Sequence, residues 1–294
     1  MKVLITGANG QVGFELVRQA ESKGIDYCAF TRAELDITDS QAVEQVITTC
    51  KPDIVINAAA YTAVDKAEDE PELAFAVNRD GVANLAKACQ GADIPMIHIS
   101  TDYIFDGTKE GAYTEEDVPN PLSVYGQSKW EGEEVIRANL KKHIILRASW
   151  VFGIHGNNFV KTMLRLGRDH KELQIVADQR GGPTPAIAIA ETLLQIAHLV
   201  IHESRQSWGT YHYCGTPIVS WYDFAREIFQ IANEELGLSK PDLGKILTKD
   251  YPTRATRPLN SELDCESIKE AFSITPTSWK PVLVELVRNI EYKS

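Results

Sequence analysis

Short apolar runs alternate with longer stretches of helical periodicity through the first half of the chain. The runs that predict strands are 2–6, 26–30, 54–57, 96–99 and 143–147, and the stretches that predict helices are 11–23, 39–50, 73–91 and 125–140. Parallel strands need a crossover between them, and the crossover is usually a helix. This alternation therefore predicts an α/β fold with a doubly wound parallel sheet, in a domain that spans residues 1–150.

The second half of the chain is less regular. It predicts helices that end near His170 and at 186–202, strands at 173–176 and 211–214, and a helix that begins at Ser220. Ser220 and Asp223 form a capping box before the apolar residues of that helix. We expect a smaller, mixed ligand-binding domain at 151–294, with some segments returning to the first domain. Because no repeat or linker separates the two halves, the cleft between them is the expected ligand site.

Glycine recurs at every third position where the first predicted strand meets the first predicted helix. Gly7, Gly10 and Gly13 permit a tight turn, a close approach of backbone to a pyrophosphate, and close packing of helix on strand. The N–H groups at the start of the helix then face the phosphates. This position of the motif predicts dinucleotide binding and a Rossmann-type sheet.

The ends of the second and third predicted strands carry further candidates for cofactor binding. Where an acid for the ribose 2′-hydroxyl is usual, the chain has Thr31 and Arg32, and an arginine could pair with a 2′-phosphate. We therefore expect NADPH to be preferred and NADH to be possible, although Arg32 could also be a surface charge. Asp36 and Ile37 are the next candidates at the adenine end. The segment 58–62 offers small residues against which a cofactor could lie, or which could fill a tight core.

A candidate proton donor lies in the middle of the chain. Ser100 and Thr101 follow an apolar strand, at the edge of a parallel sheet where ligands bind. Tyr125 and Lys129 lie four residues apart on one face of a predicted helix. The ammonium of Lys129 is expected to lower the pKa of the Tyr125 phenol from about 10 towards the working pH. The alternative is an ordinary solvated pair, but of ten tyrosines only Tyr125 has a lysine four residues later.

Composition and charge exclude several classes of partner. The 294 residues carry a formal net charge of −11, which argues against nucleic acid and against an anionic membrane surface. The five scattered cysteines contain no C-x-x-C pair and are expected to be reduced thiols. No leader or membrane span is recognisable, so we expect a cytoplasmic protein.

Taken together, these motifs resemble the dTDP-4-dehydrorhamnose reductase family of extended short-chain dehydrogenases/reductases. The resemblance runs nearly end to end. Its most specific parts are Ser-Thr-Asp-Tyr-Ile-Phe-Asp-Gly at 100–107 and Ser-Trp-Val-Phe-Gly at 149–153. It implies reduction of the C4 keto group of dTDP-4-dehydro-L-rhamnose to dTDP-L-rhamnose with NAD(P)H, so the expected partner is a sugar nucleotide.

The resemblance also implies a role for particular residues. Tyr125 would protonate the C4 oxygen, Lys129 would lower the tyrosine pKa and bind the nicotinamide ribose, and Thr101 would orient the oxygen. The implied cofactor-binding residues are Gly7, Asn9, Gly10, Gln11, Val12, Arg32, Asp36, Ile37, Ala58, Ala59, Ala60, Tyr61, Thr62, Ser100, Tyr125 and Lys129. The implied substrate-binding residues are Val64, Thr101, Asp102, Phe105, Trp150, Asn157, Asn158 and Arg257. Trp150 would lie against the sugar ring, and Arg257 would neutralise part of the diphosphate.

The family also has members with a magnesium ion held by acids at a dimer interface. Glu15 and Glu191 occupy suitable positions, but Ile187 stands where another acid is expected. We therefore predict no catalytic metal and regard a structural Mg²⁺ as doubtful, with a homodimer left open.

Two other functions remain as alternatives. Sugar nucleotide epimerases and dehydratases share the fold and the tyrosine–lysine pair, but dehydratases tend to carry a glutamate where this chain has Tyr103. The regulatory subunit of methionine adenosyltransferase is also similar to these reductases and acts by binding a partner enzyme. The presence of Thr101, Tyr125 and Lys129 favours an active enzyme.

Overall fold

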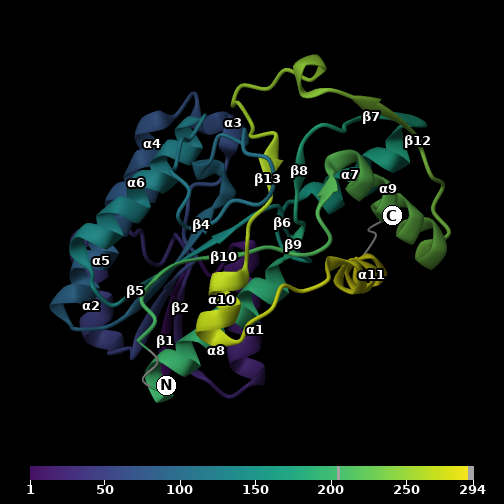
Figure 1. The fold of residues 1–294 in the computed structure, drawn as a ribbon. Helices are drawn as coiled ribbons and strands as arrows, with labels where there is room; N and C mark the ends of the chain where they lie inside the picture. Colours follow the sequence, from purple (N-terminus) through teal and green to yellow (C-terminus); the bar gives the residue numbers. More distant parts are fainter. Residues whose placement is uncertain (204–205, 291–294) are drawn as a thin grey trace.

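The computed structural model describes residues 1–203 and 206–290, and a six-stranded parallel sheet forms its centre (Figure 1). Its strands are β1 (Lys2–Thr6), β2 (Asp26–Phe30), β3 (Ile54–Asn57), β4 (Met96–Thr101), β5 (His143–Ala148) and β10 (Gly209–Tyr213). The order in the sheet is β10-β5-β4-β3-β1-β2, and every neighbouring pair is parallel. The chain reverses direction across the sheet between β1 and β3, which is where such sheets bind ligands. The predicted doubly wound fold is confirmed.

Helices cover both faces of this sheet. On one face lie α1 (Gln11–Ser22) and α8 (Ala186–His202), and on the other lie α2 (Ser40–Cys50), α5 (Val82–Gly91) and α6 (Val124–Asn139). Successive side chains of a strand point to opposite faces, so Val3 and Ile5 join the first core and Leu4 joins the second. Burial on both faces explains why the strands are continuous apolar runs rather than alternating ones.

The helix expected at 73–91 is interrupted. It consists of α4 (Pro71–Phe75), the π-helical turn η1 (Ala76–Gly81) and α5. The turn directs the amide of Asn78 inward, where it accepts a hydrogen bond from Tyr61 N (2.9 Å) and donates to Tyr61 O (3.0 Å) and Ser128 Oγ (3.0 Å). π-turns often occur at functional sites. Here the turn fixes the loop after β3 against α6.

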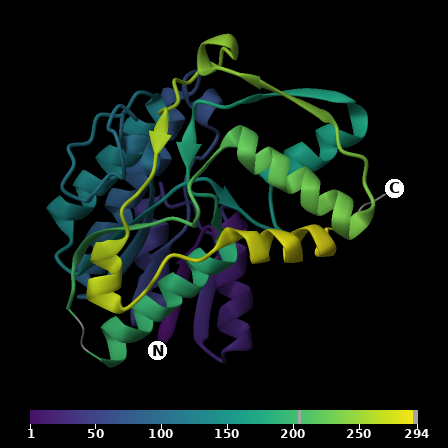
Figure 2. The same cartoon turned by 45° about the vertical axis from the view of Figure 1, so that its right-hand side comes forward.

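The second half is smaller and mixed, and part of it forms a separate layer at the right of Figure 2. Its helices and strands are β6 (Val151–Phe152), α7 (Phe159–Asp169), β7 (Glu172–Val176), β8 (Arg180–Gly181), β9 (Thr184–Pro185), β11 (Val219–Ser220), α9 (Trp221–Leu236), β12 (Asp242–Ile246), η3 (Thr248–Asp250), β13 (Asn260–Ser261), α10 (Glu266–Phe272) and α11 (Trp279–Asn289). β8 pairs antiparallel with β11 and parallel with β13. A separate core is built around Phe152, Phe224 and Trp279. Ser220 is the N-cap of α9, as expected: its Oγ accepts a hydrogen bond from Asp223 N at 3.0 Å and donates one to Asp223 Oδ2 at 2.7 Å.

Several segments of the second half lie on the large sheet. β10 pairs with β5 in register from Gly209 and Ile144 to Tyr213 and Ala148, so the strand expected at 211–214 is an edge strand of the first sheet. α8 packs along α1, and α10 packs on β10. A bridge between Tyr113 and Leu263 joins the loop after β4 to the segment that follows β13. Within residues 1–203 and 206–290, no helix combines the length and apolar character of a membrane span.

Candidate active site

The turn between β1 and α1 forms a cradle of backbone. A Cβ atom on Gly13 would lie 2.1 Å from Gly7 O, so only glycine allows α1 to approach the turn this closely. Gly7 has φ +70°, and a Cβ there would lie 2.5 Å from Ala59 N. Gly10 is the N-cap of α1 and makes no side-chain cap bond, so the N–H groups at the start of the helix face the space above the turn.

A pocket of about 310 Å³ lies over this cradle, at the point where the sheet order reverses. It is lined by Gly7, Asn9, Gly10, Arg32, Leu35, Asp36, Ile37, Ala58, Ala59, Ala60, Tyr61, Thr62, Ala63 and Val77. Eleven of these are residues expected from the sequence to bind a cofactor. Leu35, Ala63 and Val77 were not expected, because an apolar side chain in a loop or on a buried helix face has no distinguishing sequence signal. The open glycine turn and the apolar walls fit the pyrophosphate and adenosine of a dinucleotide.

Gln11 and Val12 lie at the edge of this pocket rather than in it. Val12 is buried in the core. Gln11 Oε1 accepts a hydrogen bond from Asn158 Nδ2 at 2.9 Å, and Asn158 Oδ1 caps α7 by accepting from Lys161 N at 3.2 Å. The Asn158 amide therefore joins the two halves of the chain, whereas Asn157 is exposed.

Tyr125 and Lys129 are both buried on one face of α6, as expected from their spacing. Two contacts fix the start of this helix: Ser123 Oγ accepts from Gly126 N at 3.1 Å, and Glu68 Oε1 accepts from Val124 N at 2.8 Å. A Cβ on Gly126 would lie 2.3 Å from the carbonyl oxygen of Tyr103. The glycine thus brings the first turn of α6 against η2 (Asp102–Ile104), next to Thr101 at the end of β4.

The pKa of Tyr125 is raised, which is opposite to the shift expected from the sequence. Burial is the main cause and raises it to about 12, the charge of Asp102 acts in the same direction, and a hydrogen bond with Thr101 opposes them. Lys129 does not offset this effect because its Nζ is directed elsewhere, 2.7 Å from Ile99 O and 3.1 Å from His98 Nε2. Burial lowers the pKa of Lys129 itself to about 8, against the charge of Glu133. Tyr125 is therefore a protonated phenol at neutral pH.

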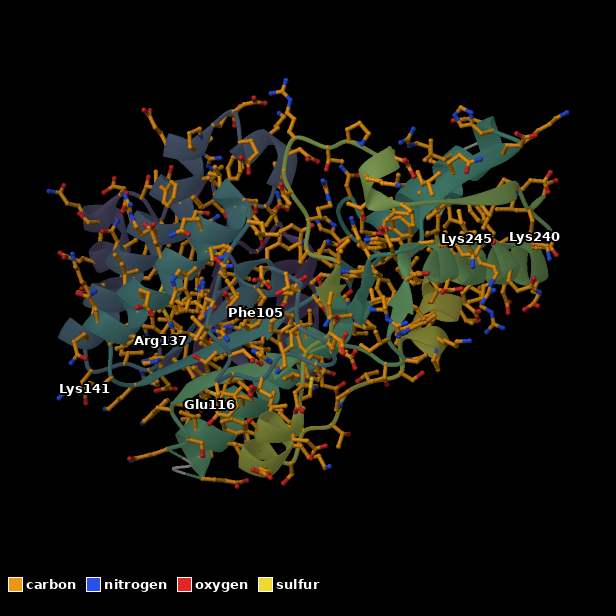
Figure 3. All side chains as sticks on the ribbon, turned by 45° about the horizontal axis from the view of Figure 1, so that its top comes forward. Phe105, Glu116, Arg137, Lys141, Lys240 and Lys245 are labelled. Carbon is orange, nitrogen blue, oxygen red and sulfur yellow. The ribbon has the colours of Figure 1, made fainter. Side chains whose placement is uncertain are left out.

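Three neighbouring residues of the same stretch have different environments. Ser100 Oγ donates to Glu133 Oε1 at 2.5 Å, so its hydroxyl is directed below the site. Asp102 is buried, accepts from Thr101 Oγ1 at 3.1 Å, and leaves its Oδ2 without a hydrogen-bond partner among the described residues. Phe105 is 1% exposed and lies in the interior (Figure 3). Its ring stacks on that of Tyr113.

Trp150 lies beyond the end of β5 and stacks on Trp221. Trp221 and Arg257 line a second pocket, of about 290 Å³, whose walls all come from the second half of the chain. Its other lining residues are Phe159, Thr162, Met163, Leu166, Leu173, Gln174, Ile175, Val176, Gln179, Tyr251 and Thr253. Gln179 Oε1 accepts from Trp221 Nε1 at 3.1 Å and holds the indole in place. The sequence did not indicate Gln179, Trp221 or Tyr251, because they are brought together only by the packing of three separate segments.

Arg257 reaches from this pocket towards the site. It forms a two-pronged ion pair with Asp65, with Nη2 to Oδ2 at 2.6 Å and Nη1 to Oδ1 at 3.2 Å, and a further bond to Tyr103. The acidic segment after β3, in which α3 (Val64–Ala67) lies, is therefore held against the second half rather than freely solvated. Val64 packs in the cluster that contains Tyr125.

The positions at which the resemblance implied a magnesium ion do not form such a site in the described chain. Glu15 Oε2 is bonded to Arg18 at 2.7 Å, and Ile187 offers its backbone oxygen to Gln19 Nε2. Glu191 is exposed and lies near Lys23. In the described part of the chain, no three His, Cys, Asp or Glu side chains converge as metal ligands would. These residues do not fit a Mg²⁺ ion.

A doubly wound sheet with a glycine cradle at its switch point, and a buried threonine, tyrosine and lysine beside it, defines a short-chain dehydrogenase/reductase. The model of the family described as the RmlD substrate binding domain matches residues 1–292. The chain belongs to this family, whose curated relatives include the dTDP-4-dehydrorhamnose reductases.

Relatives match over almost the whole chain. The dTDP-4-dehydrorhamnose reductase of Aggregatibacter actinomycetemcomitans is 48% identical over 284 residues, which cover 96% of this chain and 97% of the relative. The crystal structure of a reductase of the same name from Clostridium acetobutylicum is 39% identical, with a TM-score of 0.90 and 98% of each chain covered. The Bacillus anthracis reductase, solved in complex with NADP, is 36% identical, with a TM-score of 0.90 and coverage of 97% of this chain and 98% of its own.

Proposed function

We propose that this protein is a dTDP-4-dehydrorhamnose reductase, which reduces the C4 keto group of dTDP-4-dehydro-L-rhamnose to give dTDP-L-rhamnose. The observation that carries the proposal is the placement of Thr101 at the carboxyl end of β4, with Tyr125 and Lys129 buried one turn apart on α6. The names of relatives up to 48% identical support the same substrate.

In this mechanism Tyr125 donates its proton to the C4 oxygen. The bound nicotinamide supplies the hydride that reduces C4. The raised pKa of Tyr125 suits a donor, because the phenol keeps its proton until charge develops on the oxygen next to it. Thr101 orients that oxygen, and Lys129 binds the nicotinamide ribose. The buried setting excludes water and strengthens these hydrogen bonds.

The two pockets take the two ligands. The pocket at the β1–α1 turn binds the cofactor through the glycine cradle and the segment 58–62. The pocket that Trp221 and Arg257 line binds the nucleotide of the substrate, and Trp150 lies against the sugar. This assignment supports a division into a dinucleotide-binding domain at 1–150 and a substrate domain at 151–294, with β10, α8 and α10 packed on the first sheet.

Arg32 borders the cofactor pocket, and its charge acts on Asp36, which supports NADPH as the preferred cofactor with NADH as a second one. A cytoplasmic location stays a prediction from the reduced thiols.

The test is a turnover assay with dTDP-4-dehydro-L-rhamnose generated in place, in which the absorbance of NADPH or NADH is followed in separate samples. We expect consumption that depends on the sugar nucleotide and falls by about 100-fold or more in Tyr125→Phe, which removes the proton donor. Tyr27→Phe is the matched control, since its hydroxyl bonds only to Glu21 on the surface of the first domain.

Binding of cofactor without any turnover would overturn the proposal. It would favour the alternative of a regulatory subunit, whose partner binding would be the same in Tyr125→Phe.

A further inference from the structure

Buried polar side chains form a hydrogen-bonded chain that runs from β3 across β4 to Lys129. Asn57 Nδ2 lies 2.8 Å from His98 Nδ1, and His98 Nε2 lies 3.1 Å from Lys129 Nζ. Asn57 and His98 are fully buried and Lys129 is 2% exposed. The proposed mechanism assigns no role to Asn57 or His98.

The orientation of the Asn57 amide is fixed by its other contacts. Asn57 Oδ1 accepts a hydrogen bond from the backbone N of Ala59 at 3.1 Å and from Thr6 Oγ1 at 2.6 Å. A backbone N–H can only donate, so the atom that faces Ala59 must be the amide oxygen. The amide NH₂ therefore faces His98.

This orientation determines which nitrogen of His98 carries the proton. The NH₂ group of Asn57 donates to Nδ1, so Nδ1 must be unprotonated. A neutral imidazole then carries its proton on Nε2, and the Nε2–H points at Lys129 Nζ. Burial is the main cause that holds the pKa of His98 well below its usual value, which keeps the ring neutral.

An N–H donor directed at Nζ favours one protonation state of the lysine. A neutral amine has a lone pair that accepts the Nε2–H and retains an N–H for Ile99 O, 2.7 Å away. An ammonium has no lone pair and would place a hydrogen against the Nε2–H. We propose that Asn57 and His98 are positioning residues that hold Lys129 as a neutral amine and so set the pH range in which it carries a proton. This inference rests on the proposed function of Lys129.

The charged groups around Lys129 do not account for its protonation state in place of His98. On α6, Glu133 favours the ammonium, but its carboxylate is paired with Arg147 of β5 and with Arg137. From η2, Asp102 acts on Tyr125. From η1, Arg79 pairs with Asp80 and Glu131 outside the site. His98 is thus the titratable group hydrogen-bonded to Nζ in the described chain.

The first test reads the tautomer directly, in protein that carries ¹⁵N-labelled histidine. We expect one of the seven histidines to show Nε2 protonated and Nδ1 bare at neutral pH, and His98→Gln identifies that signal by its loss. A His98 protonated on Nδ1, or on both nitrogens, would overturn the proposal. The measurement needs no turnover, so its failure is distinct from failure of the proposed function.

The second test uses Asn57→Asp to reverse the direction of the hydrogen bonds from residue 57 through His98 to Lys129. The carboxylate keeps the hydrogen bonds from Ala59 and Thr6, but it can only accept a hydrogen bond from His98. The proton of the neutral imidazole therefore moves to Nδ1. The unprotonated Nε2 then accepts a hydrogen bond from Lys129 as an ammonium. We expect the NMR titration midpoint of Lys129 to rise by about one unit or more, and the basic limb of the pH dependence of kcat to move with it.

Thr6→Val is the matched control, because Ala59 N still fixes the Asn57 amide, so the tautomer should not change. A higher lysine midpoint in Asn57→Asp with Nε2 still protonated would be an effect of added charge alone and would overturn the assignment.

Discussion

The indole rings of Trp150 and Trp221 lie parallel, with centroids 3.5 Å apart and planes 6° apart. Trp150 has φ +47°, a left-handed conformation that is uncommon for a bulky residue and typical of functional sites. Trp150 lies two residues after the end of β5, while Trp221 begins α9. The stack therefore joins the edge of the large sheet to the second half of the chain, and it fixes the ring that is proposed to face the sugar.

Loss of this stack should weaken substrate binding more than catalysis. In Trp221→Leu, Trp150 loses a partner whose stacking contributes about 1 kcal/mol, so we expect KM for the sugar nucleotide to rise about fivefold to tenfold and kcat to stay within about twofold. Steady-state kinetics measure both. Trp208→Leu, which removes a partly buried indole outside the site, should change neither. A fall in kcat with KM unchanged would contradict the proposed role of the stack.

The cofactor preference should depend on Arg32. Arg32→Ala removes a guanidinium that could pair with the 2′-phosphate, so we expect kcat/KM for NADPH to fall about tenfold and that for NADH to stay within about twofold. The ratio of the two values in each variant is the measurement. Arg226→Ala is the control, because this exposed arginine of α9 pairs only with Asp223. An equal fall in kcat/KM with both cofactors would show that Arg32 does not distinguish the 2′-phosphate, which would contradict the prediction.

Asp102 should make stability depend on pH. Burial raises its pKa to about 6, whereas an unfolded aspartate titrates near 3.9. The folded state therefore binds more protons between these values, and stability from this group falls as pH rises from about 4 to about 6, by about 3 kcal/mol in total.

Asp102→Asn should remove this loss of stability. In urea unfolding, the free energy of unfolding of the variant should therefore rise relative to that of the parent between about pH 4 and about pH 6. Asp93→Asn, at an exposed site, should show no such trend. A parallel pH dependence of the parent and Asp102→Asn would contradict the shift.

Glu133 and Arg147 form a buried ion pair beneath the site, with Oε2 and Nη2 2.7 Å apart and side-chain exposures of 0% and 2%. Glu133→Gln would leave the Arg147 charge buried without its partner, and we expect a loss of about 3–5 kcal/mol in the free energy of unfolding. Glu134→Gln on the same helix breaks only an exposed pair with Arg137 and should cost less than about 1 kcal/mol. Similar losses of unfolding free energy in both variants would show that the buried ion pair stabilises the fold no more than the exposed one.

Much of the first domain could be predicted from local pattern. The strands at 2–6, 26–30 and 54–57 have the bounds expected from the sequence. Those at 2–6 and 54–57 are apolar runs buried on both faces, which differ clearly from amphipathic helices. The π-turn at 76–81 could not be predicted, since it keeps apolar side chains on the same buried side and depends on the bonds that Asn78 makes to Tyr61 and Ser128.

The sequence by itself determined the class of fold, the glycine cradle and the spacing that places Tyr125 and Lys129 on one helix face, because these depend on residues close together in the chain. The tertiary structure alone decided the pKa values of these side chains, since burial and distant partners set them. His98 lies 31 positions before Lys129, and Asn57 lies 41 positions before His98. No local pattern encodes such contacts; they exist only where β3, β4 and α6 pack together.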